Sequence, residues 1–166
     1  MRRILLSIVT VVAVVSLSGS AAASTLRVRI DPNDSSSKLD IHKVITNLSG
    51  TTVYLRLKSW DRFTPRDMGR QIWVFVLDTV GTYRLDRDVV IYQRDGRLGC
   101  QVFEHNSPIQ IGRRQATRPD RKSAACHLPR RWFGHIDRAV RFRALLYRRH
   151  HVIDKAPSYG HMYRWL

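Results

Sequence analysis

Two groups of aspartates are the residues of this chain whose types best suit metal binding. Asp31 and Asp34 lie in the segment DPND, and Asp78 and Asp86 lie within VFVLDTVGTYRLDRDVVIY at residues 74–92. A calcium ion takes about six to eight oxygen ligands from carboxylates, carbonyls and water, so two acidic loops that meet in space would form a site for it. The sequence therefore predicts a structural calcium site built from Asp31, Asp34, Asp78 and Asp86.

Both acidic segments also have a purely structural interpretation, which the sequence leaves open. In the first segment, Asp31, Asn33, Asp34 and Asp40 would form Asx-type turns. In the second segment, Val80 and Thr82 interrupt the two-residue spacing of acidic side chains that is typical of a metal-binding loop. In this interpretation Asp78 caps the end of a buried strand, Gly81 supplies a left-handed turn position and Asp86 bonds loop amides. An EF-hand is excluded, because neither the glycine position nor the terminal glutamate of that loop fits.

Residue patterns typical of catalysis are absent from the sequence. It contains no G-x-S-x-G, H-E-x-x-H or C-x-x-C motif and no phosphate-binding glycine loop. Glu104 is the only glutamate, which excludes a hydrolase that uses a pair of glutamates. The spacing of His150, His151, Asp154 and His161 matches no closed metal site. The sequence therefore favours a non-catalytic protein, and a small hydrolase with an aspartate-based site is the alternative.

The chain is strongly basic, which favours binding to anionic polymers. It contains 29 Lys and Arg residues against 13 Asp and Glu residues, and its formal net charge is +16. The excess is greatest over residues 113–149, where the field would attract nucleic acid, phosphate-rich wall polymers or acidic glycans. A solvated surface without a ligand explains these charges equally well. The candidate contacts for an anionic polymer are Arg113, Arg114, Arg118, Arg121, Lys122, Arg130 and Arg131.

Three tryptophans are candidates for flat binding platforms. Trp60, Trp132 and Trp165 fall near predicted loops, where an indole ring could stack on a sugar or a nucleic-acid base. The alternative is that a small β domain needs these rings in its core.

The two cysteines of the chain predict a disulfide. Cys100 and Cys126 each lie in a segment of alternating apolar residues, and in an exported protein an even pair indicates a bridge. We expect such a bridge to stabilise the domain by about 2–4 kcal/mol.

Alternation of apolar and polar residues predicts the strands that would position these groups. Asp95 and Gly96 predict a hairpin between two of them, and short helical turns are predicted at 65–70 and 129–136. The fold class is therefore all-β, an antiparallel β-sandwich or jelly roll with one short helix at most, and a closed barrel is the alternative. The predicted strands are 25–30, 52–59, 72–77, 89–94, 98–103, 123–128, 138–148 and 161–166.

The N-terminal residues are typical of an export signal. Arg2 and Arg3 precede an apolar run at residues 4–17, and the small residues Ala21, Ala22 and Ala23 follow it. A run of this length is shorter than the roughly 20 residues of a membrane-spanning helix, although an uncleaved anchor remains the alternative. The sequence thus predicts a signal peptide at 1–23, a single domain at 24–166 and a secreted or envelope-associated protein.

Four segments resemble a group of small secreted actinobacterial β-sandwich proteins of uncharacterised activity. They are DPNDSSSKLDIHKV, YLRLKSWDRF, VFVLDTVGTYRLDRDVVIY and VIDKAPSYGHMY. More distantly, the layout is similar to DOMON-like and carbohydrate-binding sandwiches, and this similarity implies a ligand-binding or adhesive module with acidic loops that can hold calcium. Thr82 stands where that pattern has an aspartate. Together, the residues and the resemblance predict a secreted non-catalytic module that binds a polysaccharide or an anionic wall polymer, or else a purely structural secreted protein.

Overall fold

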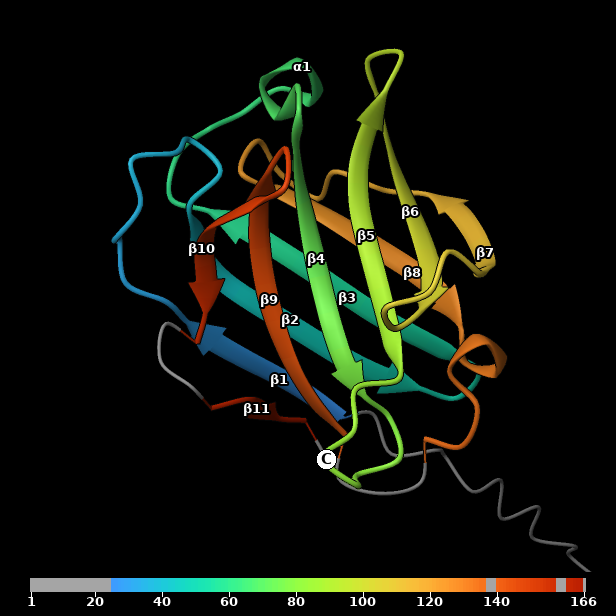
Figure 1. The fold of residues 1–166 in the computed structure, drawn as a ribbon. Coiled ribbons are helices and arrows are strands. Elements are labelled where there is room, and N and C mark those ends of the chain that lie inside the picture. The colour runs from blue at the N-terminus through green and yellow to red at the C-terminus, as the bar shows by residue number, and fades with distance from the viewer. Residues whose placement is uncertain (1–24, 137–139, 158–160, 166) are drawn as a thin grey trace, which may run out of the picture.

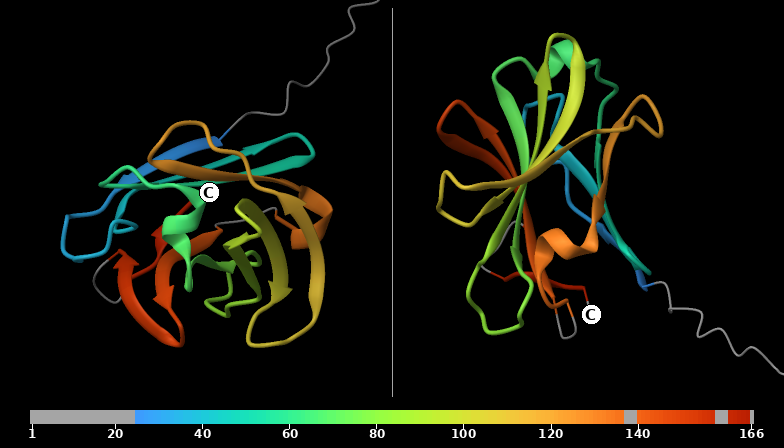
Figure 2. Two further views of the ribbon diagram at one scale, coloured as in Figure 1. Left: turned by 90° about the horizontal axis from the view of Figure 1, so that it is seen from above. Right: turned by 90° about the vertical axis from the view of Figure 1, so that its right-hand side faces the viewer.

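Two antiparallel β-sheets pack face to face in the computed structural model, which describes residues 25–136, 140–157 and 161–165 (Figure 1). The smaller sheet has the order β1-β2-β3-β8, formed by Thr25–Ile30, Ile41–Ser49, Thr52–Ser59 and Ser123–Pro129. The larger sheet has the order β10-β9-β4-β5-β6-β7, formed by His151–Ala156, Arg141–Arg148, Gln71–Asp78, Arg87–Arg94, Arg97–Glu104 and Gln110–Gln115, with β11 (Tyr163–Arg164) paired to β9. Figure 2 shows the two layers from above and from the side. The predicted all-β sandwich is confirmed.

Period-2 alternation builds the core between the sheets, because successive side chains of a strand point to opposite faces. In β3 the buried side chains are Val53, Leu55 and Leu57, and the residues between them are half-buried. The run QIWVFVLD of β4 is buried on both faces. Its Trp73, Phe75 and Leu77 enter the main core, and its Val74 and Val76 join a second apolar cluster on the outer face.

The edge strand β1 turns its apolar side chains away from the core. Leu26, Val28 and Ile30 are 56%, 45% and 65% exposed. Val28 pairs with Ile45, a half-buried residue whose neighbours Val44 and Thr46 point inward, so the apolar parity of β1 falls on the outer face. Arg29 lies opposite Val44, and its guanidinium sits 5.8 Å from the centre of the Tyr163 ring. The predicted alternation is present, but the arginines of β1 lie on the face toward the core and its apolar side chains lie on the outer face.

The predicted turns and short helices are present. Asp95 and Gly96 have φ values of 51° and 75°, which gives the left-handed turn expected between β5 and β6. The predicted helical windows contain the short α-helix α1 (Pro65–Met68) and the 3-10 turn η1 (Arg130–Phe133). Three strands are additional to those predicted, namely β2, β7 and β10.

The sheets are joined at opposite edges by two contacts between residues distant in sequence. The predicted disulfide links Cys100 of β6 to Cys126 of β8. At the other edge the backbone N–H of Ile41, the first residue of β2, donates a 2.7 Å hydrogen bond to Oδ2 of Asp154 on β10. The disulfide is thereby confirmed. No described helix has the length and apolar character needed to cross a membrane. The predicted signal peptide at 1–23 lies outside the described residues.

Candidate functional site

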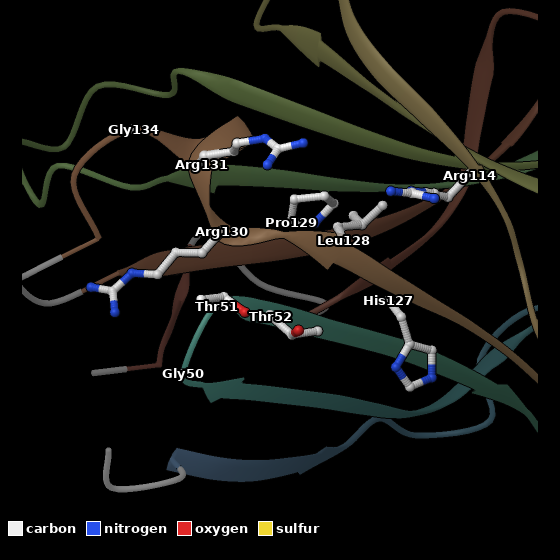
Figure 3. A pocket seen from close by; sticks show the side chains of 10 residues that line it. All are labelled: Gly50, Thr51, Thr52, Arg114, His127, Leu128, Pro129, Arg130, Arg131 and Gly134. Carbon is white, nitrogen blue, oxygen red and sulfur yellow. The ribbon is translucent and has the colours of Figure 1, made fainter. Parts of the chain in front are cut away.

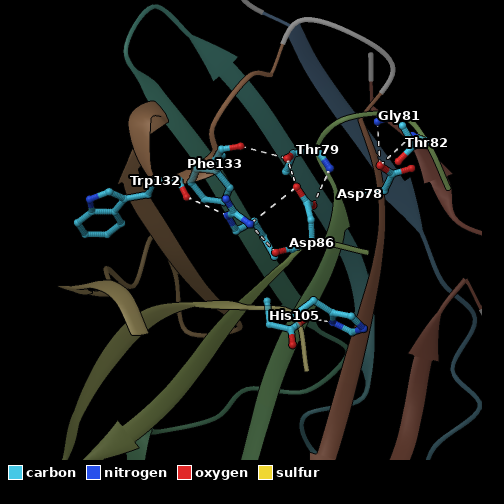
Figure 4. A network of polar contacts seen from close by, with 10 residues as sticks. Asp78, Thr79, Gly81, Thr82, Asp86, His105, Trp132 and Phe133 are labelled. Carbon is cyan, nitrogen blue, oxygen red and sulfur yellow. Dashed lines mark hydrogen bonds and ion pairs between the residues drawn. The ribbon is translucent and has the colours of Figure 1, made fainter. Parts of the chain in front are cut away.

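Asp78 organises the loop between β4 and β5 (Figure 4). Its fully buried carboxylate accepts hydrogen bonds from the backbone N–H groups of Gly81, Thr82 and Tyr83 at 2.8, 3.2 and 2.7 Å. The guanidinium of Arg141 lies 3.8 Å from the same carboxylate. A carboxylate that accepts several amide hydrogens stabilises a tight turn, so the structural interpretation accounts for Asp78.

Asp86 ties the end of the same loop to its beginning. Its two carboxylate oxygens accept hydrogen bonds from the backbone N–H and the hydroxyl of Thr79 at 2.9 and 2.5 Å (Figure 4). The Thr79 hydroxyl also lies 3.0 Å from the carbonyl oxygen of Phe133, and the loop is therefore anchored to η1. Both carboxylates of this loop have structural partners.

A different aspartate completes an acidic cluster with Asp31 and Asp34. One carboxylate oxygen each from Asp31, Asp34 and Asp154 lies within 4.8 Å of the others. Asp31 and Asp34 follow β1, whereas Asp154 lies on β10 of the other sheet. Among the described residues, these three side chains form the one group of three or more acidic or metal-ligating residues close enough to share an ion. Asp78 and Asp86 do not belong to it. The four predicted ligands therefore do not form one site. Asp31 and Asp34 lie together with Asp154, and Asp78 and Asp86 lie outside this cluster.

Asp40 lies beside Asp154 at the base of this cluster. Burial and the neighbouring Asp154 raise the pKa of the Asp40 carboxyl to about 7. The pKa of Asp154 is also raised, chiefly by burial. Two adjacent carboxyls with raised pKa values resemble the acid pair of a hydrolase. However, the Asp40 side chain is only 1% exposed, so a substrate bond cannot reach it.

Five of the seven predicted polymer-binding residues lie in two groups at opposite ends of β8, and the other two, Arg113 and Arg114, lie on β7. Arg118, Arg121 and Lys122 precede β8, whereas Arg130 and Arg131 follow it, about 20 Å away for a strand of this length. In the first group, Arg118 donates to the carbonyl oxygen of Phe63 and Lys122 donates to that of Trp60. These contacts use part of the donor capacity of the first group to hold neighbouring loops.

Arg130 and Arg131 of the second group, together with Arg114, line a cavity of about 750 Å³ (Figure 3). Arg114 comes from β7, His127 from β8, and Arg130 and Arg131 from η1. In Figure 3 the arginine side chains extend from separate elements around this space. The lining residues are Gly50, Thr51, Thr52, Arg114, His127, Leu128, Pro129, Arg130, Arg131 and Gly134, and none of them is acidic.

A second cavity, of about 470 Å³, continues the basic surface toward the β5–β6 hairpin. Arg114 lines both cavities, and the second also has Arg94, Arg97 and Arg113 but no acidic side chain. Arg94 and Arg97 are additional to the predicted contacts, although their place beside the predicted Asp95–Gly96 turn could have indicated them. We call the six arginines around the two cavities the basic strip, namely Arg94, Arg97, Arg113, Arg114, Arg130 and Arg131.

Trp132 supports the centre of the basic strip. Its ring covers Gly112, where an added Cβ atom would lie 2.5 Å from the indole, and the Arg114 guanidinium lies 5.9 Å from the centre of the ring. Gly112 and Arg114 are both on β7, so this close packing sets the position of the strand beside η1. Trp132 is half-buried and is not among the residues that line either cavity.

The other two predicted platforms have different surroundings. Trp165 is 1% exposed and packs edge-on against Phe142 in the core. The prediction of a binding platform at Trp165 is therefore wrong, because a ring enclosed by apolar neighbours presents no face to a ligand. Trp60 is half-buried and stacks on His42 with ring centres 3.9 Å apart.

The outer face of the larger sheet carries a third cavity, of about 410 Å³, which the sequence does not reveal. Asp88 and Tyr147 line it together with apolar residues. The carboxylate of Asp88 lies 2.8 Å from Nδ1 of His105, so the imidazole of His105 is held in place (Figure 4). Asp88 lies on β5, Tyr147 lies on β9 with β4 between them, and His105 follows β6, so the strand order of the larger sheet brings these residues together and no sequence motif contains all three.

Comparison of the chain with protein-family models, curated proteins and solved structures finds no match. The arrangement of the described residues thus carries the functional argument.

Proposed function

We propose that this protein is a secreted, non-catalytic module that binds an anionic polymer along the basic strip. The observation that carries the proposal is the position of Arg114, which lines both cavities and joins them into one cationic surface. Phosphate- or carboxylate-bearing cell-wall glycans have the matching chemistry, because guanidinium groups bind both anions through paired hydrogen bonds.

The shape of the basic strip favours a polymer over a small anion. Arg94 and Arg97 stand at the β5–β6 turn, whereas Arg130 and Arg131 belong to η1, which follows β8 of the other sheet. Such an arrangement spreads positive charge over several strands instead of concentrating it around one phosphate. A chain with regularly spaced negative charges would contact several of these arginines at once, and each contact would release counterions.

The contacts of two arginines show that the basic strip is partly preorganised. Arg130 donates a 2.8 Å hydrogen bond to the carbonyl oxygen of Ile136, and Arg114 lies over Trp132. Each such contact uses at most one of the five N–H donors that an arginine side chain carries. These arginine side chains therefore lose less conformational freedom when a ligand binds, and this favours tight binding.

The test is binding of purified wall teichoic acid, a carboxylated glycan and a neutral glucan to the protein at several salt concentrations. We expect binding to the two anionic polymers and a linear fall of log affinity with log salt. The double variant R114A/R131A should bind about tenfold more weakly and show a smaller salt slope, because two cationic contacts are lost.

The matched control is R62A/R66A, which removes the same charge from exposed residues beside α1, at the other end of β8 from η1 (Figure 1). Equal weakening by the two double variants would show a non-specific charge effect and contradict a site at Arg114. Salt-resistant binding to the neutral glucan would also contradict the proposal.

A further inference from the structure

The cluster of Asp31, Asp34 and Asp154 brings together carboxylates from the two sheets. The backbone N–H of Asp31 donates a 2.9 Å hydrogen bond to the carbonyl oxygen of His42, which holds the start of the β1–β2 loop against β2. A register shift between Val152 and Asp154 interrupts the pairing of β10 with β9 next to the third carboxylate. Each of the three side chains has an oxygen within 4.8 Å of the other two.

Buried oxygen atoms without hydrogen-bond donors provide a second observation. Asp40 and Asp154 are 1% and 6% exposed, and both oxygens of Asp40 and Oδ1 of Asp154 have no hydrogen-bond partner. The backbone N–H of Ser35 lies near the Asp40 carboxyl but does not form a hydrogen bond with it. No ion pair found in the described residues involves Asp34, Asp40 or Asp154.

The buried carboxyls of Asp40 and Asp154 need either a cationic partner or a shared proton, because a buried charge without compensation is strongly destabilising. Oxygens that bind the same calcium ion at about 2.3–2.6 Å lie no more than about 5 Å apart, which agrees with the spacing of the cluster. The β1–β2 loop also offers backbone carbonyls, and water completes the coordination of calcium in many proteins.

We propose that Asp31, Asp34 and Asp154 bind one calcium ion, and that Asp40 lies behind them as a further acceptor. A cavity of about 210 Å³ opens beside the cluster and is lined by Asp34, Val152, Ile153, Asp154 and Lys155, so a hydrated ion has a route to these oxygens. The ion would connect the β1–β2 loop of the smaller sheet to the edge strand β10 of the larger sheet. This site is independent of the basic strip and uses none of its residues.

A proton shared between Asp40 and Asp154 is the competing explanation for the buried carboxyl pair. The two explanations differ at Asp34, which is exposed and belongs to the three-carboxylate cluster but not to the buried pair. Asn in place of Asp34 removes one charge from a calcium site and leaves a proton shared between Asp40 and Asp154 in place.

The test is isothermal titration of the purified full-length protein with Ca²⁺ and with Mg²⁺, after treatment with chelator, followed by thermal unfolding with and without about 1 mM Ca²⁺. We expect one Ca²⁺ per chain, a higher melting temperature with Ca²⁺ than with chelator, and weaker binding of Mg²⁺. The variant D34N should weaken Ca²⁺ binding at least tenfold while it unfolds like the wild type in chelator.

The control D95N removes one negative charge from the exposed β5–β6 turn and should bind Ca²⁺ like the wild type. Absence of Ca²⁺ binding, or Ca²⁺ binding that D34N leaves unchanged, would overturn the site. Equal affinity for Mg²⁺ and Ca²⁺ would overturn the assignment to calcium. None of these readouts depends on polymer binding.

Discussion

The backbone N–H of Ile41 donates a 2.7 Å hydrogen bond to Oδ2 of Asp154, although the two residues are 113 positions apart in the sequence. The bond joins the first residue of β2 to the edge strand β10 and therefore connects the two sheets. It gives the buried Asp154 a structural role whether or not a metal is present.

Replacement of Asp154 by alanine should destabilise the protein even in chelator. The change leaves the buried N–H of Ile41 without an acceptor, and an unsatisfied buried donor costs about 1–3 kcal/mol. The variant D154N retains an acceptor oxygen and should lose less. Urea unfolding with chelator measures both effects, and equal stability of D154A and the wild type would show that the bond contributes nothing.

Alanine at Asp78 should be more destabilising than alanine at Asp86. Each carboxylate lies near one guanidinium, that of Arg141 for Asp78 and that of Arg87 for Asp86, but Asp78 is fully buried and accepts three amide hydrogens, whereas Asp86 is partly exposed and accepts two hydrogens from Thr79. We expect D78A to lower the free energy of unfolding by about 3–5 kcal/mol, because the change leaves a partly buried arginine uncompensated. Calcium affinity of D86A should equal that of the wild type, since Asp86 lies outside the acidic cluster. Thermal unfolding and calcium titration test the two statements separately.

Replacement of Gly112 by alanine should weaken polymer binding through Trp132. The added methyl group would lie 2.5 Å from the indole, so the ring must move, and Arg114 would lose its contact with it. We expect a shift in tryptophan fluorescence together with a several-fold loss of affinity for the anionic polymer. In the background W132A the clash is absent, so adding G112A should have little further effect on affinity. An equal loss in both backgrounds would contradict this coupling.

Reduction of the disulfide should destabilise the chain by about 2–4 kcal/mol. Cys100 and Cys126 are 26 residues apart, and their bond closes a loop that includes β7. The loss should appear as a lower urea midpoint in the presence of reductant. The double variant C100A/C126A should have the lower midpoint already and should not respond to reductant.

The stability that the N-terminus of α1 contributes to the protein should change with pH through the carboxyl of Asp67. The backbone N–H and hydroxyl of Thr64 donate to its carboxylate at 2.6 and 2.8 Å and lower the pKa of Asp67. Because the folded-state pKa lies below the unfolded value of about 3.9, the unfolded chain binds more protons over that interval, and stability falls as the pH decreases through it. The stability difference between the wild type and D67A should therefore be full at pH 6 and shrink below about pH 4.

The sequence predicts the sandwich well because most strands alternate strictly. It does not predict β2, in which the inward position of Thr46 is polar and the outward position of Ile45 is apolar. It does not predict β10 either, because a buried Asp154 occupies a position where an apolar side chain is expected. The acidic cluster was predictable only in part, since Asp31 and Asp34 are three positions apart in one loop, whereas the strand that brings Asp154 to them depends on the packing of the sheets.

The alternation of residues in a strand also does not determine which of its two faces points toward the core. Leu26, Val28 and Ile30 share one face as predicted, yet that face points outward because register with β2 decides which side meets the core. The basic strip has a similar origin. Arg94 and Arg113 come from different strands, and only the order of strands in the larger sheet brings them to one cavity.

The positions of the two inter-sheet connections, Cys100–Cys126 at one edge and Ile41–Asp154 at the other, determine how the sandwich can open. When only the disulfide is cut, the Ile41–Asp154 hydrogen bond still joins β2 to β10, whereas the β6–β8 side is held by the Thr117–Ala125 backbone pair and the apolar core. The sheets should then separate first at the β6–β8 side. The first amide hydrogens to exchange in the reduced protein should then be those of β7 and β8, while β2 and β10 remain protected.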